Sequence, residues 1–509
     1  MSNKMLKTAG FMTIATLLAK VCGMGRDMLI AAYFSTGYVG DAYMTATKLP
    51  TMLFDLVIGG VITASFIPVF TGVMGKDGKE KAFDYANKFI GLVLSITVLI
   101  AVIGITFSES LIGLLAPEFD AQTAGLASEL SKIMFPMIIF TGLAFSFVGI
   151  LQSNGEFNIP AMMSLVSNLA VIAYFPLFGK RFGVHGLSVA MLVAWSLQVI
   201  IQIPALKKTG YKFRPSLRLF NQDIKQTLLL AGPLLISTWV QPLYSVVNTR
   251  IASGISGGVT MLEYANRLYT VMVGVFSFVV TNLVFPKLSK SNSENDKQEA
   301  TNLLVTSIKV IFIVILPIMT GFILLSRPIT GVIYEHGNFN STDAAKTAMA
   351  LSCYSVGMLG FSINEILSKA FFSQRNSKTP MYNAIISMVI NIILAYSLSM
   401  RLGINGLALA TAGGSVTNAI LNYICMRRES GKLFNKSDVL SILKTIVSTV
   451  IMGICVFFTY NYLKNIVDKN TLGWLICCIA SGVVGVISYA ISCILLGVDE
   501  IKMLIKERL

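Results

Sequence analysis

The chain has 509 residues, of which 54% are hydrophobic and only 13% charged, and its mean hydropathy is +0.73. This composition excludes an ordinary soluble globular protein and indicates an integral membrane protein. The net charge of +15 does not indicate a nucleic-acid partner, because the basic residues gather in segments expected on one membrane face. The seven cysteines lie in or beside apolar runs, which is typical of buried side chains rather than of a disulfide framework.

Long apolar runs recur along the whole chain. A transmembrane helix needs about 20 predominantly apolar residues. By this rule the fold is all-α, with 14 transmembrane helices expected over 8–34, 41–75, 83–108, 123–152, 159–179, 183–206, 222–255, 259–289, 298–326, 341–373, 379–401, 404–426, 439–463 and 471–497. The first run lacks a cleavage site followed by a soluble domain, so we expect it to stay as a spanning helix.

The loops predict the orientation of these helices. With the N-terminus inside, the segments on the cytoplasmic side carry 24 Lys and Arg residues and the outer segments carry 6. The positive-inside rule therefore predicts a multi-pass protein with both termini in the cytoplasm. The basic run 207–225 is most simply a topogenic loop near anionic lipid.

The two halves of the chain repeat. Lys48 matches Arg267 at an offset of 219 residues, and five further pairs are 220 residues apart: Pro160 and Pro380, Gly183 and Gly403, Gly186 and Gly406, Leu187 and Leu407, and Ala190 and Ala410. An even number of helices in each unit predicts two parallel six-helix repeats related by an axis along the membrane normal. The predicted domains are an N-lobe at 1–206, a cytoplasmic basic linker at 207–226, a C-lobe at 227–428, and two extra helices with a tail at 429–509.

Several charged residues lie inside predicted helices. A charge near the bilayer centre costs about 2.5–3.5 kcal/mol on insertion scales, so these residues should face a water-filled cavity or one another. The candidate substrate-binding cations are Lys20, Arg26, Lys48, Arg250 and Arg267, and the candidate gating or coupling acids are Asp27, Asp41 and Asp55. The excess of cations predicts an anionic substrate, and the planar guanidinium of arginine suits a phosphate.

A structural role is the alternative for some of these charges. Arg26 could pair with Asp27 and Lys48 with Asp41, but adjacent residues lie about 100° apart around a helix, so we expect Arg26 and Asp27 not to face each other. Glu365 and Lys369, four residues apart, predict a structural ion pair.

The sequence contains no metal-binding, nucleotide-binding or hydrolase motif. We therefore expect a transporter with no catalytic residues, no metal and no cofactor. A membrane glycosyltransferase or acyltransferase is the alternative from another class, since such enzymes can hold their chemistry in scattered loop residues. The residues leave open whether an ion or the membrane potential drives transport.

Motifs along the chain carry a family resemblance. They are GRDMLIAAYF, GDAYMTATKLP, ASFIPVF, GILQSNGEFNIPA, LEYANRLYTVMVGVF, VFPKLSK, YEHGNF, FFSQRNSKTP and GINGLALATA. Together they resemble the MurJ/MviN lipid II flippase family, within the multidrug/oligosaccharidyl-lipid/polysaccharide exporter superfamily, over nearly all of the first twelve helices. The resemblance implies two lobes around a cationic cavity, with the last two helices shaping a groove for a polyprenyl tail.

The resemblance also implies roles for individual residues. Arg26, Asp27, Asp41, Lys48 and Arg267 stand at matching positions, and Lys20 stands where the family usually has arginine. In the family such cations bind the diphosphate of the lipid, and the Asp41 end of the cavity acts as an outer gate. This chain departs from the family after KLP, where TMLFDLVIGG, with Asp55, replaces a basic pair followed by Glu-Gly.

These expectations describe a flippase for the undecaprenyl-diphosphate-linked peptidoglycan precursor, lipid II. It would move the lipid from the inner to the outer leaflet of the bacterial cytoplasmic membrane by alternating access, for cell wall biogenesis and cell shape. The alternatives are a flippase for another polyprenyl-linked oligosaccharide and a multidrug antiporter, which would need acids in the cavity. The expected partners are lipid II or a similar polyprenyl-diphosphate lipid, the bacterial membrane and the cell-wall synthesis machinery.

Overall fold

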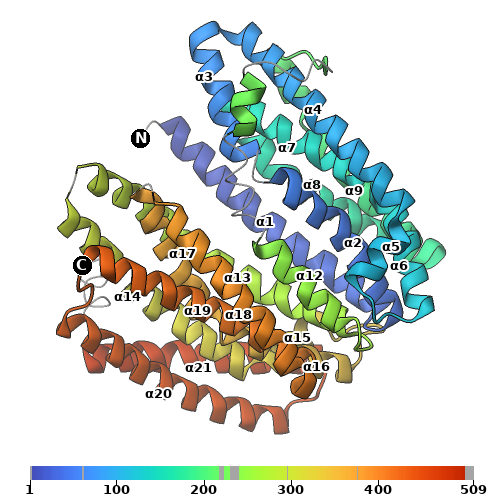
Figure 1. Ribbon diagram of the computed structural model, residues 1–509. Coiled ribbons are helices and arrows are strands. Elements are labelled where there is room, and N and C mark those ends of the chain that lie inside the picture. Colours follow the sequence, from blue (N-terminus) through green and yellow to red (C-terminus); the bar gives the residue numbers. More distant parts are fainter. Residues whose placement is uncertain are drawn as a thin grey trace. The chain divides into compact units, whose positions relative to one another are not determined.

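The computed structural model describes residues 3–59, 62–216, 223–229, 240–294, 296–374 and 376–498, and this part of the chain is helical, without strands (Figure 1). The chain forms two compact units, residues 1–260 and 261–509. The predicted lobe, linker and tail boundaries stay a prediction.

The first unit holds the helices of the N-terminal half together with the segment 240–260. Its helices are α1 (Asn3–Phe34), α2 (Tyr38–Phe54), the π-helices η1 (Asp55–Gly59) and η2 (Ile62–Phe66), α3 (Ile67–Asp77), α4 (Lys79–Thr106), α5 (Ser108–Leu115), α6 (Ala121–Met134), α7 (Met137–Ser153), α8 (Asn158–Tyr174), the π-helix η3 (Phe175–Gly179), α9 (Lys180–Ile200), α10 (Ile203–Thr209), a short helix over 223–229, and α12 (Val240–Ala252). The first residues of α13 (Gly258–Ser293) also belong to this unit.

The second unit contains the rest of α13 and all later helices. These are α14 (Lys297–Leu324), α15 (Ser326–Tyr334), α16 (Ser341–Ser355), α17 (Met358–Ser373), α18 (Lys378–Leu402), α19 (Ile404–Ser430), α20 (Lys436–Ile466) and α21 (Thr471–Leu496). Figure 1 shows α20 and α21 side by side, and both pack within this unit.

The predicted apolar runs coincide with observed helices, with two kinds of difference. The run 41–75 is broken by the two π-helices. The short helices α5 and α15 lie almost wholly between predicted spans, and α10 overlaps the end of the span predicted over 183–206. By length and composition, 6 helices of the described residues could each cross a membrane, or up to 8 if each of two bent pairs counts as one span; the range Asn158–Thr209 among them covers two predicted helices. The number 14 stays a prediction, and most of 222–239 lies outside the described residues.

The internal repeat is visible in the backbone of each unit. The pair α6 and α7 bends by 41°, and the pair α16 and α17 bends by 42°. Gly183 has φ 53° and ψ −143°, and Gly403 has φ 55° and ψ −131°, a conformation that residues with a side chain rarely adopt. Both glycines stand where one helix ends and the next begins, which explains why the sequence needs glycine 220 residues apart.

A cluster of aromatic rings forms the core at one end of the first unit. Phe66 stacks on Tyr85 and Phe89 with ring centroids 5.5 and 4.5 Å apart, and all three side chains are buried. These rings join the broken second span to α4, so the π-helical break lies against a buried aromatic cluster.

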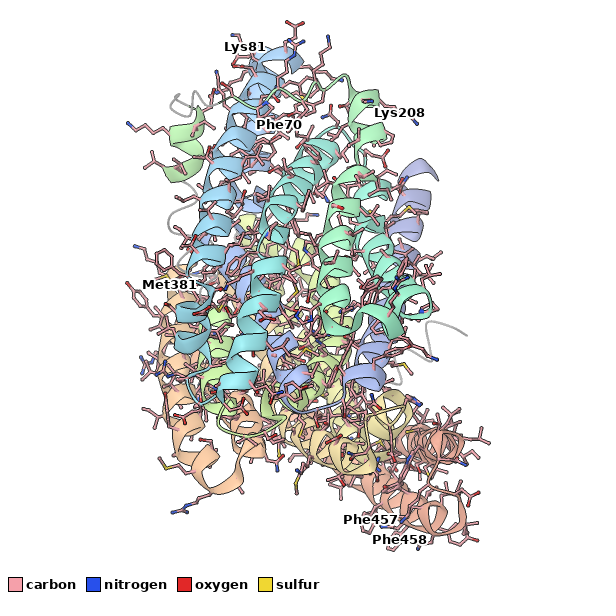
Figure 2. All side chains as sticks on the ribbon, turned by 90° about the vertical axis from the view of Figure 1, so that its right-hand side faces the viewer. Phe70, Lys81, Lys208, Met381, Phe457 and Phe458 are labelled. Carbon is pink, nitrogen blue, oxygen red and sulfur yellow. The ribbon has the colours of Figure 1, made fainter. Side chains whose placement is uncertain are left out.

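The first part of the predicted basic linker is fixed on α4. The Asn87 side chain donates to the Lys212 carbonyl at 3.1 Å and accepts from the Tyr211 hydroxyl at 2.6 Å and the Arg214 amide at 2.9 Å. Figure 2 shows Lys81 and Lys208 at the same end of the first unit. Lys208, Lys212 and Arg214 therefore lie at one end of the unit.

The last two helices are anchored to the second unit at both ends. At one end, Lys309 of α14 pairs with Asp438 of α20 at 2.9 Å. At the other, the guanidinium of Arg327 lies 4.4 Å from the ring of Trp474 on α21 and pairs with Glu335 at 2.7 Å. Between these contacts α20 exposes apolar side chains, of which Figure 2 labels Phe457 and Phe458.

Candidate functional site

The first charged cluster lies on α1. The Arg26 guanidinium donates from Nε and from one terminal nitrogen to the same Asp27 carboxylate oxygen, at 3.0 and 2.8 Å. The expectation that these adjacent residues do not face each other is wrong, because the arginine side chain is long enough to fold back along the helix. The Asp27 side chain is 9% exposed and that of Arg26 17%, so the ion pair is shielded from water.

Asn168 of α8 completes this cluster. Its side-chain oxygen accepts from the other terminal nitrogen of Arg26 at 3.0 Å, and its amide nitrogen donates to the Ala19 carbonyl at 2.9 Å. A Cβ atom at Gly23 would lie 3.2 Å from the Asn168 amide, so the missing side chain allows α8 to approach α1 closely. Asp27 and Asn168 therefore fix the position of the guanidinium before any ligand binds.

Lys20 lies on the same helix, six residues before Arg26, which corresponds to about 9 Å along the axis. Its side chain is half-buried, and no described residue forms an ion pair or a hydrogen bond with its ammonium group. Lys20 is thus a half-buried cation that is available to an anion.

The second charged group surrounds Asp41 in the first turn of α2. The buried Asp41 carboxylate accepts from the Gly257 amide at 2.7 Å, from the Thr260 amide at 2.8 Å and from the Thr260 hydroxyl at 2.7 Å. Gly40 allows this contact, because a Cβ atom there would lie 2.8 Å from the Thr260 hydroxyl oxygen. Asp41 therefore binds the N-terminal end of α13, where helix N–H groups lack partners and favour a negative charge.

Other contacts hold α12 and the following turn in the first unit. The Lys48 ammonium donates to the Thr249 hydroxyl at 2.8 Å, and one Arg250 nitrogen donates to the Leu114 carbonyl at the end of α5, also at 2.8 Å. Arg250 is exposed, whereas Lys48 is half-buried. The alternative of a Lys48–Asp41 ion pair is not observed, since each residue bonds to a different part of the segment 249–260.

Asp55 begins the π-helix η1, directly after α2, and its side chain is exposed. Single π-helical turns inside α-helices occur frequently at functional sites. The helix geometry therefore changes within TMLFDLVIGG, the stretch for which the resemblance implies a departure from the family.

In the second unit, Arg267 and Glu263 lie on α13 with half-buried side chains, and both have interaction partners. The predicted pair of Glu365 and Lys369 on α17 is present as a charge interaction, although the two side chains do not form a close ion pair. Lys369 instead lies 5.5 Å from the ring centre of Phe285, a cation–π contact.

Sequence reasoning missed the neutral partners of the charged residues, namely Asn168, Thr249, Gly257 and Thr260. Asn168 carried a weak signal, because an asparagine inside an apolar helix must be hydrogen-bonded when it is buried. The two threonines and Gly257 carried none, since their role depends on contacts between segments about 200 residues apart.

The chain resembles known proteins over most of its length. The family described as lipid II flippase MurJ matches residues 30–476. The probable lipid II flippase MurJ of Rickettsia prowazekii (strain Madrid E) is 29% identical over 492 residues, covering 89% of this chain and 97% of the relative. The corresponding protein of Haemophilus influenzae (strain ATCC 51907 / DSM 11121 / KW20 / Rd) is 26% identical, covering 97% and 100%.

Solved structures agree with these relatives. A lipid II flippase MurJ in an inward closed conformation matches with a TM-score of 0.81 and 26% identity, covering 96% of this chain and 99% of that one. A multidrug resistance MATE family transporter of the MOP superfamily, in an inward-facing conformation, matches with a TM-score of 0.69 over 82% of this chain and 95% of that one; at 17% identity it shows the fold alone. Since the family match spans most of the sequence, the chain belongs to the lipid II flippase MurJ family.

Proposed function

We propose that this protein moves lipid II from the inner to the outer leaflet of a bacterial cytoplasmic membrane by alternating access. Membership of the flippase family supports the substrate. The observation that carries the proposal is the arrangement on α1. There a preorganised guanidinium and an ammonium with no partner among the described residues lie about two helical turns apart inside an apolar helix.

The diphosphate of the lipid would bind to Lys20, Arg26, Lys48 and Arg267. Arg26 suits this role because Asp27 and Asn168 orient it while leaving further N–H groups of the guanidinium for the ligand. We leave Arg250 out, because it is exposed and its guanidinium already binds the carbonyl end of α5.

Asp41 would act as the outer gate. Its carboxylate holds the start of α13 with three hydrogen bonds. Opening at this point must break them, and a hydrogen bond to a charged group contributes about 1.5–3 kcal/mol. Substrate binding or the energy source must offset that cost, which couples opening to transport.

The proposed orientation, with both termini in the cytoplasm, rests on the distribution of basic residues. The bias of 24 to 6 basic residues supports cytoplasmic termini. Figure 2 shows Lys81 and Lys208 at a common end of the first unit, which would be the cytoplasmic end.

We also propose that transport needs no cofactor and draws on an ion or on the membrane potential, with Asp27 and Asp55 as the acids to test. The cell-wall synthesis machinery on the outer side would consume the product.

Depletion in the native bacterium tests the proposal. If the protein flips lipid II, its depletion should cause intact lipid II to accumulate in the inner leaflet while the cells lose their shape. Accumulation of a different polyprenyl-linked saccharide, with normal handling of lipid II, would contradict it and favour the related flippase.

A further inference from the structure

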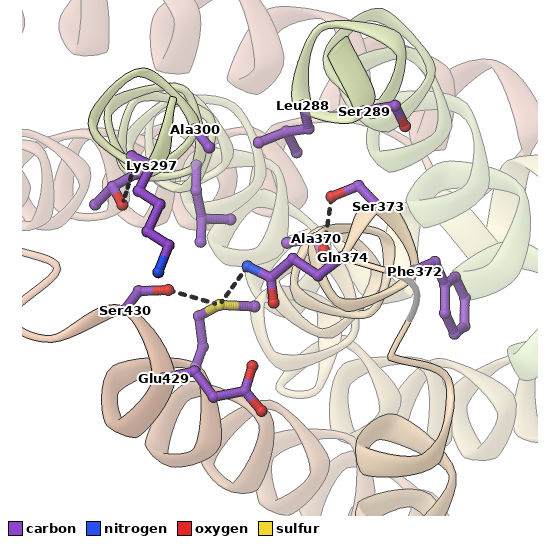
Figure 3. A pocket seen from close by; sticks show the side chains of 13 residues that line it. Leu288, Ser289, Lys297, Ala300, Ala370, Phe372, Ser373, Gln374, Glu429 and Ser430 are labelled. Atoms are coloured by element: carbon purple, nitrogen blue, oxygen red, sulfur yellow. Dashed lines mark hydrogen bonds between the residues drawn. The ribbon is translucent and has the colours of Figure 1, made fainter. Parts of the chain in front are cut away.

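The second unit contains a cavity of about 810 Å³ that the diphosphate site does not use. It lies where α13 ends, α14 begins, and α17 and α19 end (Figure 3). Its size falls within the range of about 300–1,000 Å³ that is typical of small-ligand pockets. In the proposed orientation this end of the helices faces the cytoplasm, so the cavity would be open on the side from which the substrate arrives.

The cavity carries one charge of each sign. Lys297 and Glu429 both line it, from α14 and α19, and their side chains are exposed to solvent. Within the described residues they do not pair with each other, and the Lys297 ammonium has no acid partner. One oxygen of Glu429 accepts from Asn376 at 3.1 Å, which fixes the carboxylate and leaves its other oxygen available. A ligand with a carboxylate and an amine would match both charges.

Two polar side chains beside these charges are exposed to solvent and have only a weak acceptor within the protein. Gln374 donates to the sulfur of Met426 at 3.9 Å and Ser430 donates to the same sulfur at 3.5 Å, and the described part of the chain offers them no other acceptor. A thioether is a weak acceptor. Figure 3 shows Lys297 extending toward Ser430, with Gln374 close by. These donors could turn to the carbonyl oxygens of a bound peptide without losing a strong hydrogen bond.

We propose that this cavity binds the peptide portion of the peptidoglycan precursor, with Lys297 on a peptide carboxylate and Glu429 on a free peptide amine. Gln374 and Ser430 donate to peptide carbonyls. This inference rests on the proposed function, because it takes the peptide from the transported headgroup. It assigns peptide recognition to the second unit, by residues separate from the cations that would hold the diphosphate.

A zwitterionic phospholipid headgroup has the same pair of charges, but it fits less well. Its phosphate and amine are joined by a short linker that lacks carbonyl groups, so it offers nothing to Gln374 and Ser430. A peptide supplies both charges and the acceptors between them, and it uses more of the volume.

Binding to the purified full-length protein in detergent tests the proposal by calorimetry. The probe is a synthetic pentapeptide with an acetylated N-terminus, one free lysine side-chain amine and a free terminal carboxylate. Lys297→Ala should weaken its binding about tenfold, and so should Glu429→Gln. Lys297→Ala should cause no further loss of affinity for a peptide with an amidated C-terminus, because the carboxylate that Lys297 would bind is already absent. For the same reason, Glu429→Gln should cause no further loss for a peptide with an acetylated lysine, which lacks the free amine.

Matched variants outside the cavity serve as controls. Lys290→Ala and Glu294→Gln remove the same charges from an exposed pair at the end of α13, 3.9 Å apart, and should leave binding unchanged. Failure of the wild-type protein to bind the peptide would overturn the proposal. Equal losses for all peptide analogues would do the same, and so would binding of phosphoethanolamine alone with the same dependence on Lys297 and Glu429. Because this assay involves no transport, its failure is distinguishable from a failure to flip the lipid.

Discussion

Asp41 and Thr260 are joined by two hydrogen bonds, one from the Thr260 backbone amide at 2.8 Å and one from its hydroxyl at 2.7 Å. They connect the start of α2 to the first turn of α13, across 219 residues of sequence. Both residues are buried, with exposed fractions of 2% and 0%. The negative charge therefore lies in a site where an unpaired donor or acceptor would be costly.

The contributions of the Thr260 hydroxyl and the Asp41 carboxylate to stability can be measured separately. Thr260→Val removes one donor to the carboxylate and keeps the shape, so it should lower the free energy of unfolding by about 1.5–3 kcal/mol. Asp41→Ala should cost more, because it leaves the amides of Gly257 and Thr260 without an acceptor. Thermal unfolding of the purified variants measures the order, and an Asp41→Ala protein as stable as wild type would refute a holding role for the carboxylate.

Arg26 and Arg267 are predicted to be essential for growth support. Replacing either with alanine should abolish complementation of a depleted strain while membrane levels stay normal. Arg26→Lys should rescue only partly, because an ammonium cannot contact Asp27 and Asn168 in the way that the guanidinium fork does. Lys290→Ala, at an exposed site, is the control. If both alanine variants transport normally, the arginines are structural and do not hold a diphosphate.

The matching glycines predict matching losses of stability. Alanine at Gly183 or Gly403 must adopt a positive φ, which costs about 1–3 kcal/mol at each position. Gly321→Ala is the control, because this helical glycine has open space around its missing Cβ atom and alanine favours the helix. Unfolding midpoints should fall for the first two variants and hold or rise for the third. A loss at only one of the two glycines would argue against equivalent roles in the repeat.

Topology can be tested with reporters. The charge bias predicts that a fusion at the C-terminus is cytoplasmic and that one inserted between α15 and α16, which begins at residue 341, is external. Alkaline phosphatase and green fluorescent protein fusions at both sites report the two sides independently. Finding both sites on one side of the membrane would contradict the predicted helix count.

Much of the fold was predictable, because the lengths of the apolar runs and the repeated spacing of the glycines can be read directly from the sequence. The runs 298–326 and 379–401 correspond to α14 and α18 within a few residues. The π-helices after Phe54 were not predictable, since nothing in TMLFDLVIGG marks a change from α to π geometry. The hydrophobic period and the length of an apolar run predict that a helix exists, but they do not predict the pattern of its backbone hydrogen bonds.

The sequence was enough to find the charged residues of the candidate site, but not the partners to which they bind. Arg26 and Asp27 stood out because charges are rare in apolar helices. Their ion pair was rejected from backbone geometry alone, although a long side chain can override the angle between adjacent positions. The partners of Lys48 and Asp41 required the tertiary fold, because Thr249 and Thr260 lie far along the chain.

The central claim is the movement of lipid II by this protein, and reconstitution measures it most directly. Purified protein in vesicles with labelled lipid II is given a membrane-impermeant reagent that modifies the headgroup. The account predicts that unchanged lipid II becomes accessible from the opposite leaflet with the wild-type protein and not with Arg26→Ala. Equal accessibility with both proteins, or a new covalent product in place of intact lipid II, would contradict it.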